Sequence, residues 1–186
     1  MINFRKAKFV KSATNRTECP NDLSEIVFIG KSNVGKSSLI NALCDNKGLA
    51  FTSSKPGHTR LLNYFLIDSQ FYLVDAPGYG YSAAGQKHTM IFGDMMEDYF
   101  GGKEQIRCVV FLLDSRRELN NDDFDFYEFL IENNIPYIIC MTKCDKLNQS
   151  EKAKMMKVIN TSLPNLDKSN LFFTSCKDQR SLDCLK

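Results

Sequence analysis

The sequence at positions 30–37 reads Gly30-Lys31-Ser32-Asn33-Val34-Gly35-Lys36-Ser37, and this stretch decides the fold. An apolar run at 26–29 precedes it, and a helical pattern begins at Ser38 directly after it. A strand, then G-x-x-x-x-G-K-S, then a helix is the phosphate-binding P-loop in its supporting context. The alternative is a plain Gly/Ser turn between a strand and a helix, and the two flanking elements favour the P-loop.

The chemistry of this loop matches the negative charge of a nucleotide's phosphates. Inward-facing backbone N–H groups, the close approach that glycine permits and a helix N-terminus all attract anions. Lys36 adds a positive charge for the β- and γ-phosphates, and the Ser37 hydroxyl is suited to a bound Mg²⁺. We therefore expect every residue from Gly30 to Ser38 to contact the nucleotide, and Lys36 to act in catalysis as well.

The composition is that of one globular domain of 186 residues, 43% hydrophobic and 25% charged. No apolar run reaches the roughly 18 residues of a membrane span, and the first residues lack the apolar core of a secretory signal. The seven cysteines are odd in number and lack paired spacing, which argues against a disulfide framework and indicates a reducing compartment. We therefore expect a cytoplasmic protein without a membrane partner.

Positive charge is concentrated at the N-terminus, although the net charge of the chain is only +2. Residues 1–17 contain no acid and five bases, which are Arg5, Lys6, Lys8, Lys11 and Arg16. Such a segment is either a contact for the phosphate backbone of RNA or a solvated edge of the fold, and the sequence favours neither. We assign residues 1–22 to a basic arm or short strand of the same domain.

The rest of the chain alternates strand and helix patterns. Nearly continuous apolar runs at 106–113 and 135–141 are typical of strands buried on both faces. Two β-type runs at 61–67 and 71–74 predict an antiparallel hairpin. Further strands are expected at 24–29 and 171–173, and helices at 37–44, 87–100, 121–131, 150–159 and 178–186. This order predicts a three-layer, doubly wound α/β fold, with helices on both faces of a mostly parallel, six-stranded sheet that has one antiparallel strand.

A second motif follows the hairpin and reads Asp75-Ala76-Pro77-Gly78. A carboxylate at this strand end is suited to hold Mg²⁺ through water, and the Gly78 N–H is suited to touch a γ-phosphate. Loss of that phosphate would release the loop, so we interpret the motif as a switch. Taken alone it is also a simple Asp-Pro-Gly turn, and the preceding P-loop favours the switch.

A third motif follows the strand expected at 135–141 and reads Thr142-Lys143-Cys144-Asp145. A carboxylate here can accept two hydrogen bonds, from N1–H and N2–H₂ of guanine. Adenine lacks the 2-amino group and presents a lone pair at N1, so it would leave the carboxylate unpaired and be rejected. The stem of Lys143 is expected over the base and toward the P-loop. The alternative is an ordinary charged turn at a strand end.

Two weaker signals complete the set. After the last expected strand the chain reads Thr174-Ser175-Cys176, whose backbone is suited to contact guanine O6. In the polar loop at 50–60, Thr59 is the candidate for a second protein hydroxyl on Mg²⁺, with Gly57 and His58 beside it at the nucleotide. His58 is otherwise a solvated loop histidine.

Taken together, these motifs resemble those of the translation-factor-like small GTPases. Further stretches resemble one family among them, the EngB (YihA/YsxC) family: Lys55-Pro56-Gly57-His58-Thr59-Arg60, Leu62-Asn63-Tyr64-Phe65, DAPGYGYS at 75–82 and Asp114-Ser115-Arg116. The resemblance runs from about Phe9 to Leu185, and TK-x-D for NK-x-D is usual in that family. It implies a single GTP-binding domain at 23–186, GTP/GDP and Mg²⁺ as ligands, and GTP hydrolysis. It also implies a monomer that binds a precursor of the large ribosomal subunit and has a link to cell division.

Tyr79 departs from the pattern of Ras-type GTPases, which place a water-orienting Gln directly after DxxG. No general base is evident, so we expect slow intrinsic hydrolysis that involves Lys36, Thr59 and Gly78. Some related GTPases use an Asn in the P-loop to hold K⁺, and Asn33 occupies that position, so we expect K⁺ to stimulate hydrolysis. Alternatively, the ribosome supplies the missing catalytic group.

Two other classes of function stay open at this stage. A small-molecule kinase or an ATPase can carry the same P-loop, but it would need an acceptor-binding lid or a catalytic base, and Asp145 argues against adenine. A nucleotide-binding scaffold with negligible hydrolysis is also consistent with the missing Gln. A preference for guanine over adenine would distinguish a GTPase from a kinase or an ATPase. GTP turnover in the presence of ribosomal particles would distinguish a GTPase from a non-hydrolysing scaffold.

Overall fold

The computed structural model describes residues 2–51, 61–79, 93, 96–101 and 104–186. Its strands are β1 (Ala7–Ala13), β2 (Ser24–Gly30), β3 (Leu62–Ile67), β4 (Phe71–Asp75), β5 (Ile106–Asp114), β6 (Tyr137–Thr142) and β7 (Leu171–Phe173). Its helices are α1 (Lys36–Leu43), α3 (Asn121–Glu132), α4 (Gln149–Ser162) and α5 (Gln179–Asp183), and residues 96–100 are also helical. None of the described helices is long and apolar enough to cross a membrane.

The strands form one seven-stranded sheet in the order β1-β3-β4-β2-β5-β6-β7. All pairs from β4 to β7 are parallel, whereas β3 is antiparallel to both of its neighbours, β1 and β4. The expected hairpin and the single antiparallel strand are therefore confirmed. The expected number of six strands is wrong, because the N-terminal segment pairs with β3 from Ala7 opposite Ile67 to Ala13 opposite Leu62.

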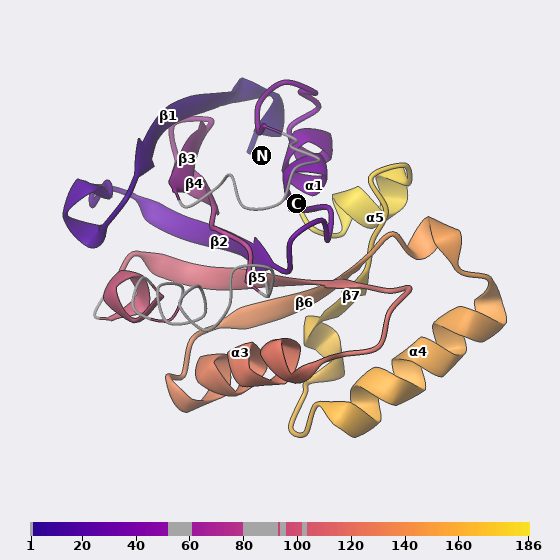
Figure 1. The fold of residues 1–186 in the computed structure, drawn as a ribbon. Coiled ribbons are helices and arrows are strands. Elements are labelled where there is room, and N and C mark those ends of the chain that lie inside the picture. The colour runs from indigo at the N-terminus through magenta and orange to yellow at the C-terminus, as the bar shows by residue number, and fades with distance from the viewer. Residues whose placement is uncertain (1, 52–60, 80–92, 94–95, 102–103) are drawn as a thin grey trace.

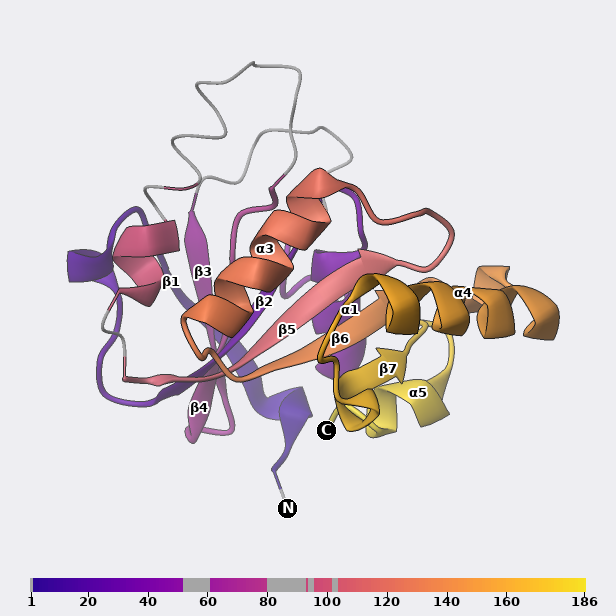
Figure 2. The ribbon, with the colours of Figure 1, turned by 90° about the horizontal axis from the view of Figure 1, so that it is seen from below.

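Helices cover both faces of the sheet, which gives the three layers expected from the sequence (Figures 1 and 2). Buried side chains of α1 and α5, such as Ile40 and Leu182, pack on one face. Those of α3 and α4, such as Leu130 and Ile159, pack on the other face together with Tyr99 from the helix at 96–100. The central strands β2 and β5 contribute to both clusters because their side chains point alternately to the two faces.

Helix starts follow from local capping chemistry. Asn120 caps α3, and its side chain accepts a hydrogen bond from the Asp123 N–H. In turn, the Asp123 carboxylate accepts a hydrogen bond from the Asn120 N–H. Asn148 and Glu151 form the same reciprocal box at α4. The helix expected at 121–131 is thus confirmed as α3. Most of the helix expected at 87–100 lies outside the described residues, and the last helix, expected at 178–186, is the shorter α5.

One carboxyl group near the start of β2 is fully buried. Glu25 of β2 is fully buried, and its Oε2 accepts a hydrogen bond of 2.5 Å from the Tyr99 hydroxyl. Burial, followed by the nearby Glu25, raises the pKa of Tyr99 well above its usual range, so this tyrosine stays a donor. The bond ties the helix at 96–100, which follows the expected switch segment, to the strand that carries the P-loop.

We predict that Tyr99→Phe lowers the free energy of unfolding by about 1–3 kcal/mol, because a buried hydrogen bond to a carboxyl group is lost while the ring stays in place. Urea denaturation at neutral pH measures the change. The matched control is Tyr72→Phe, whose hydroxyl bonds the exposed Asp22 at 3.2 Å, and which should cost less than about 0.5 kcal/mol. Equal losses for the two variants would contradict a special role for the Glu25 contact.

Candidate functional site

The P-loop connects β2 to α1 and has the backbone geometry that its sequence requires. Gly35, the residue before α1, has φ +106°, a conformation that side-chain-bearing residues rarely adopt. Asn33 also has a positive φ of 63°, which asparagine tolerates better than most residues. Helix α1 then begins at Lys36, so the loop ends at a helix N-terminus that attracts anions.

Lys36, Ser37 and Asp75 meet where β4 ends and α1 begins. Asp75 is 3% exposed, and its Oδ1 forms an ion pair with the Lys36 ammonium. Its Oδ2 accepts a hydrogen bond of 3.2 Å from the Ser37 hydroxyl. Two adjacent oxygen ligands, one of them a carboxylate, match what Mg²⁺ prefers, so the residues present fit the ion. Thr59, the other expected ligand, lies outside the described residues, as do Gly57 and His58.

The DAPG motif packs directly against the P-loop. A Cβ added at Gly78 would lie 2.9 Å from the Gly30 carbonyl oxygen and 3.1 Å from the Ser32 nitrogen. Only glycine allows this close approach of the two backbones. Ala76 is fully buried beside them, and its N–H donates to the Phe28 carbonyl, which extends the β2–β4 pairing. The structure thus brings Gly78 to the phosphate loop, and its expected contact with a γ-phosphate stays a prediction.

Tyr79 points into the hydrophobic core. It is 4% exposed, and its ring stacks on Phe126 of α3 at a centroid distance of 5.6 Å. Its hydroxyl donates a hydrogen bond of 2.8 Å to the carboxylate of Asp123, which also pairs with Arg117. Burial, followed by Asp123, raises the pKa of Tyr79, so its hydroxyl keeps its proton. A side chain held in this way anchors the chain directly after Gly78 and is not available to orient water.

Lys143 links the third motif to the P-loop. Its backbone is left-handed, with φ 60°, and its ammonium donates to the Asn33 carbonyl at 2.7 Å and to Asp114 Oδ2 at 2.9 Å. The neighbouring Thr142 hydroxyl donates to the Val34 carbonyl at 2.7 Å. Two consecutive residues at the end of β6 therefore donate hydrogen bonds to two consecutive carbonyls of the P-loop. The Lys143 stem thus extends toward the P-loop, as expected.

Asp114 is the residue that holds Lys143 in place. It ends β5, and its carboxylate also accepts two hydrogen bonds from the Arg116 guanidinium, at 2.9 and 2.8 Å. Burial opposes ionisation here, but the hydrogen bonds from Arg116 and Lys143 prevail and hold the pKa of Asp114 well below its usual range. Sequence reasoning used this residue only as part of a resemblance and missed its role. An acid directly after a buried strand is the signal that could have found it.

Asp145 and the Thr174-Ser175-Cys176 motif lie side by side at the ends of β6 and β7. The Ser175 hydroxyl donates to Asp145 Oδ1 at 2.8 Å. This bond is the main cause that lowers the pKa of Asp145, so its carboxylate is ionised at neutral pH. The Cys144 N–H donates to the Thr174 carbonyl at 3.1 Å, which joins the two motifs through their backbones. Cys176 follows at the surface.

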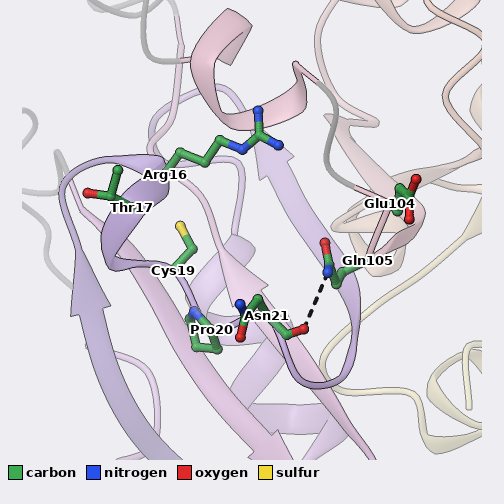
Figure 3. Close-up of a pocket in the computed structure, with 7 residues that line it drawn as sticks. All are labelled: Arg16, Thr17, Cys19, Pro20, Asn21, Glu104 and Gln105. Carbon is green, nitrogen blue, oxygen red and sulfur yellow. Dashed lines mark hydrogen bonds between the residues drawn. The ribbon is translucent and has the colours of Figure 1, made fainter.

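A separate pocket of about 430 Å³ lies at the opposite end of the strands (Figure 3). Its residues come from the segments that precede β2 and β5, and Gln105 donates to the Asn21 carbonyl across it at 3.3 Å. They are Arg16, Thr17, Cys19, Pro20, Asn21, Glu104 and Gln105. Ligands of open α/β sheets bind at the carboxyl ends of the strands, where the motifs above converge, so this pocket is not the nucleotide site.

Comparisons of the sequence identify close relatives. The family model of the 50S ribosome-binding GTPases matches residues 25–143. The probable GTP-binding protein EngB of Clostridium kluyveri is 42% identical over 187 residues, which cover 100% of this chain and 95% of that protein. The probable GTP-binding protein EngB of Chlorobium luteolum is 49% identical over 153 residues, covering 82% of this chain and 74% of that protein.

Solved structures share the fold. A crystal structure of a probable GTP-binding protein EngB matches with a TM-score of 0.63 and 25% identity, covering 87% of this chain and 94% of that one. A structure of Era in complex with MgGDPNP and nucleotides 1506–1542 of 16S ribosomal RNA matches with a TM-score of 0.65 and 25% identity, covering 88% of this chain and 54% of that one.

We predict that Asp114→Asn weakens GDP and GTP binding about tenfold, because Lys143 loses the charged partner that holds it across the P-loop. Titration with fluorescent GDP measures the loss. The control is Asp125→Asn, which removes an exposed acid of α3. An affinity like that of the control would contradict the bridging role.

The stability of the same variant should depend on pH. The lowered pKa of Asp114 means that its ionised form stabilises the folded state above the ordinary carboxylate pKa of about 3.9. The difference in stability between Asp114→Asn and the wild type should therefore shrink as the pH falls below that value.

Proposed function

We propose that this chain, which belongs to the EngB family of GTP-binding proteins, is a guanine-nucleotide switch that assists assembly of the large ribosomal subunit and is needed for normal cell division. It is a GTPase that binds guanine nucleotides. The observation that carries the proposal is the Lys143 bridge, since it fixes the base-recognition motif against the phosphate loop. One nucleotide can then be held at both ends.

The proposed nucleotide site uses the convergent motifs in separate roles. Residues 30–38 bind the phosphates, with Lys36 moving from Asp75 to the β- and γ-phosphates when they arrive. Asp145 accepts the two guanine N–H groups, and the backbone of Thr174, Ser175 and Cys176 lies at guanine O6. Support comes from the ionised state of Asp145 and its hydrogen bond to Ser175. Pairing of a carboxylate with N1–H and N2–H₂ is what excludes adenine.

The proposed metal ligands are Ser37, Thr59 and, through water, Asp75. Bound Mg²⁺ would supply positive charge that neutralises the phosphates. The oxygen atoms of Ser37 and Asp75 already lie within hydrogen-bonding distance of each other, at 3.2 Å. We propose that the segments around 57–59 and 76–78 respond to the γ-phosphate, because Gly78 packs on the P-loop backbone. Their contacts with a partner would then differ between the GTP and GDP states.

Hydrolysis by the isolated protein is proposed to be slow. The side chain that follows Gly78 is anchored at Asp123 and stacked on Phe126, so it is not available to orient the attacking water. Either K⁺ held at Asn33 or a group supplied by the ribosome would then complete the site. Both act by placing positive charge where negative charge develops in the transition state.

The ribosomal partner is proposed from the family and from Era. The matching family model describes 50S ribosome-binding GTPases, and Era has been solved with a segment of 16S ribosomal RNA. We propose that the present chain likewise binds a ribosomal precursor, that of the large subunit. We further propose that it does so as a cytoplasmic monomer with one GTP-binding domain at 23–186, to which residues 1–22 contribute.

We predict that Asp145→Asn weakens GTP and GDP binding at least about 100-fold and gains binding of xanthine nucleotides. The amide offers one donor and one acceptor, which match the C2 carbonyl and N1–H of xanthine but leave a guanine N–H group unpaired. Competition of GTP, XTP and ATP against fluorescent GDP measures both effects. Wild type should bind ATP at least about 100-fold more weakly than GTP. Equal binding of ATP and GTP by wild type would instead support the kinase or ATPase alternative.

We predict that particles of the large ribosomal subunit raise the GTPase rate at least about tenfold, and that small-subunit particles do not. Phosphate release is followed in K⁺ and in Na⁺ salts, with and without particles. Asn33→Gly is the informative variant, because glycine keeps the positive φ and removes the side-chain oxygen. It should abolish any preference for K⁺. No turnover under any of these conditions would favour the non-hydrolysing scaffold.

A further inference from the structure

Some of the basic residues near the N-terminus form ion pairs in the structure, and others do not. The Arg5 guanidinium pairs with Asp45 at 2.9 Å, and the Lys6 ammonium pairs with Asp68 at 3.2 Å. Two of the five cations in the first 17 residues therefore form ion pairs at the surface. Of the other three, Arg16 follows β1, whereas Lys8 and Lys11 lie on β1, the outermost strand of the sheet, which Figure 1 shows at one edge of the molecule.

Two lysines of β1 have no carboxylate within 4 Å in the described part of the chain. They are Lys8, which is exposed, and Lys11, which is half-buried. Lys11 is one of the minor causes that lower the pKa of Glu18, whose carboxylate already accepts hydrogen bonds from Thr14, and these bonds are the main causes.

The pairing register of β1 shows on which face each side chain lies. Lys8 and Lys11 pair with Leu66 and Tyr64 of β3, which pack in the core on one face of the sheet. Phe9 pairs with Phe65, which packs on the other face, so the two lysines lie on the face of β1 opposite to the aromatic ring.

Phe9 and Val10 lie between these lysines and are exposed to an unusual degree for large apolar side chains. Phe9 is 54% and Val10 is 42% exposed. The Phe9 ring makes an edge contact with buried Phe65, at a centroid distance of 5.9 Å and an interplanar angle of 61°. The core side chain fixes the position of the ring and leaves about half of its surface to the solvent.

The outer edge of β1 is not shaped to accept another strand. The pairing register with β3 shifts between Phe9 and Lys11, so the backbone bulges at Val10. A bulge disrupts the regular spacing of N–H and C=O groups, and lysines on an edge strand repel added strands. An extended peptide would therefore form few hydrogen bonds along this edge, although the edge exposes apolar side chains.

We propose that residues 8–11 form a docking surface for single-stranded RNA that crosses the outer edge of β1, so that an unpaired base stacks on Phe9 on one face while flanking phosphates contact Lys8 and Lys11 on the other. An exposed aromatic ring and unpaired cations are the groups that bind single-stranded RNA, because every base has a flat face and every nucleotide has a phosphate. The inference rests on the proposed function, in that the RNA is a single-stranded segment of the ribosomal precursor.

The absence of tryptophan from the chain makes stacking on residue 9 directly measurable. We expect Phe9→Trp to give a single tryptophan signal that a single-stranded RNA oligonucleotide quenches, because stacked bases quench indole fluorescence. Heparin carries negative charge without bases, so it should compete for the lysines without quenching the signal. Bound oligonucleotide, detected by anisotropy of a label on the RNA, without quenching would overturn the proposal.

Variants of Phe9 and of the two lysines measure the contributions of base stacking and of phosphate contacts separately. Phe9→Leu keeps an apolar side chain on Phe65 and should weaken oligonucleotide binding about 5- to 100-fold. Lys8→Gln/Lys11→Gln should lower the slope of log affinity against log salt concentration by about 1.4, which is the value for two phosphate contacts with a single strand. The matched control is Lys154→Gln/Lys157→Gln, which removes two exposed lysines from α4. A control that loses as much affinity as the β1 double variant would overturn the proposal.

Turnover distinguishes failure of this inference from failure of the proposed function. All variants should bind GDP like the wild type, because residues 8–11 pair with residues 64–66 of β3 and with none of the nucleotide motifs. If large-subunit particles stimulate wild type and Phe9→Leu at equal particle affinity, the ribosomal function stands and the docking surface is wrong. If the particles stimulate neither protein while the oligonucleotide still quenches Phe9→Trp, the docking surface stands and the proposed function is wrong.

Discussion

The ammonium group of Lys143 is the contact on which the arrangement of the site depends. It joins the end of β6 to the P-loop carbonyl of Asn33 and to the carboxylate of Asp114 at the end of β5. Because parallel strands end at the same edge, three segments far apart in the sequence reach this one cation. The distance between the phosphate loop and Asp145, the carboxylate proposed to recognise the base, is thereby fixed before any ligand arrives. Preorganisation of this kind reduces the entropy that binding would otherwise cost.

A second contact fixes the opposite side of the phosphate loop. Tyr79 is held by Asp123 and Phe126 of α3, and Asp123 is held in turn by the Arg117 guanidinium. Gly78 is therefore placed between a rigid anchor and the P-loop backbone. A residue that is buried to position its neighbour cannot also turn toward the phosphates. Tyr79, which stands where Ras-type GTPases have a Gln, is therefore unavailable to orient water, and this supports the proposal that an added ion or a partner is needed for rapid hydrolysis.

Local signals in the sequence were sufficient for much of the fold. The G-x-x-x-x-G-K-S stretch, two nearly continuous apolar runs and the hairpin pattern predicted the α/β architecture and the antiparallel hairpin, because each depends on neighbours within a few residues. Long-range pairing was not readable in the same way. The strand β1 has a loose pattern and two lysines, and only its pairing with β3 at 62–67 makes it part of the sheet. The role of Asp114 also depends on a partner from another segment, Lys143, which is 29 residues away.

The strand that carries the proposed RNA edge is joined to the proposed metal ligand Asp75 by one row of paired residues, which begins directly after that edge. Ser12 of β1 pairs with Asn63 of β3, and its hydroxyl donates to the Asn63 side chain at 2.7 Å. Asn63 pairs in turn with Asp75 of β4. A row of paired strands is stiff, because shifting one residue of a ladder would move every side chain of that strand. The edge at β1 is therefore suited to serve as a fixed anchor for RNA in both nucleotide states. The nucleotide-dependent part of partner binding would have to come from segments outside this ladder, and a switch of this design separates attachment from signalling.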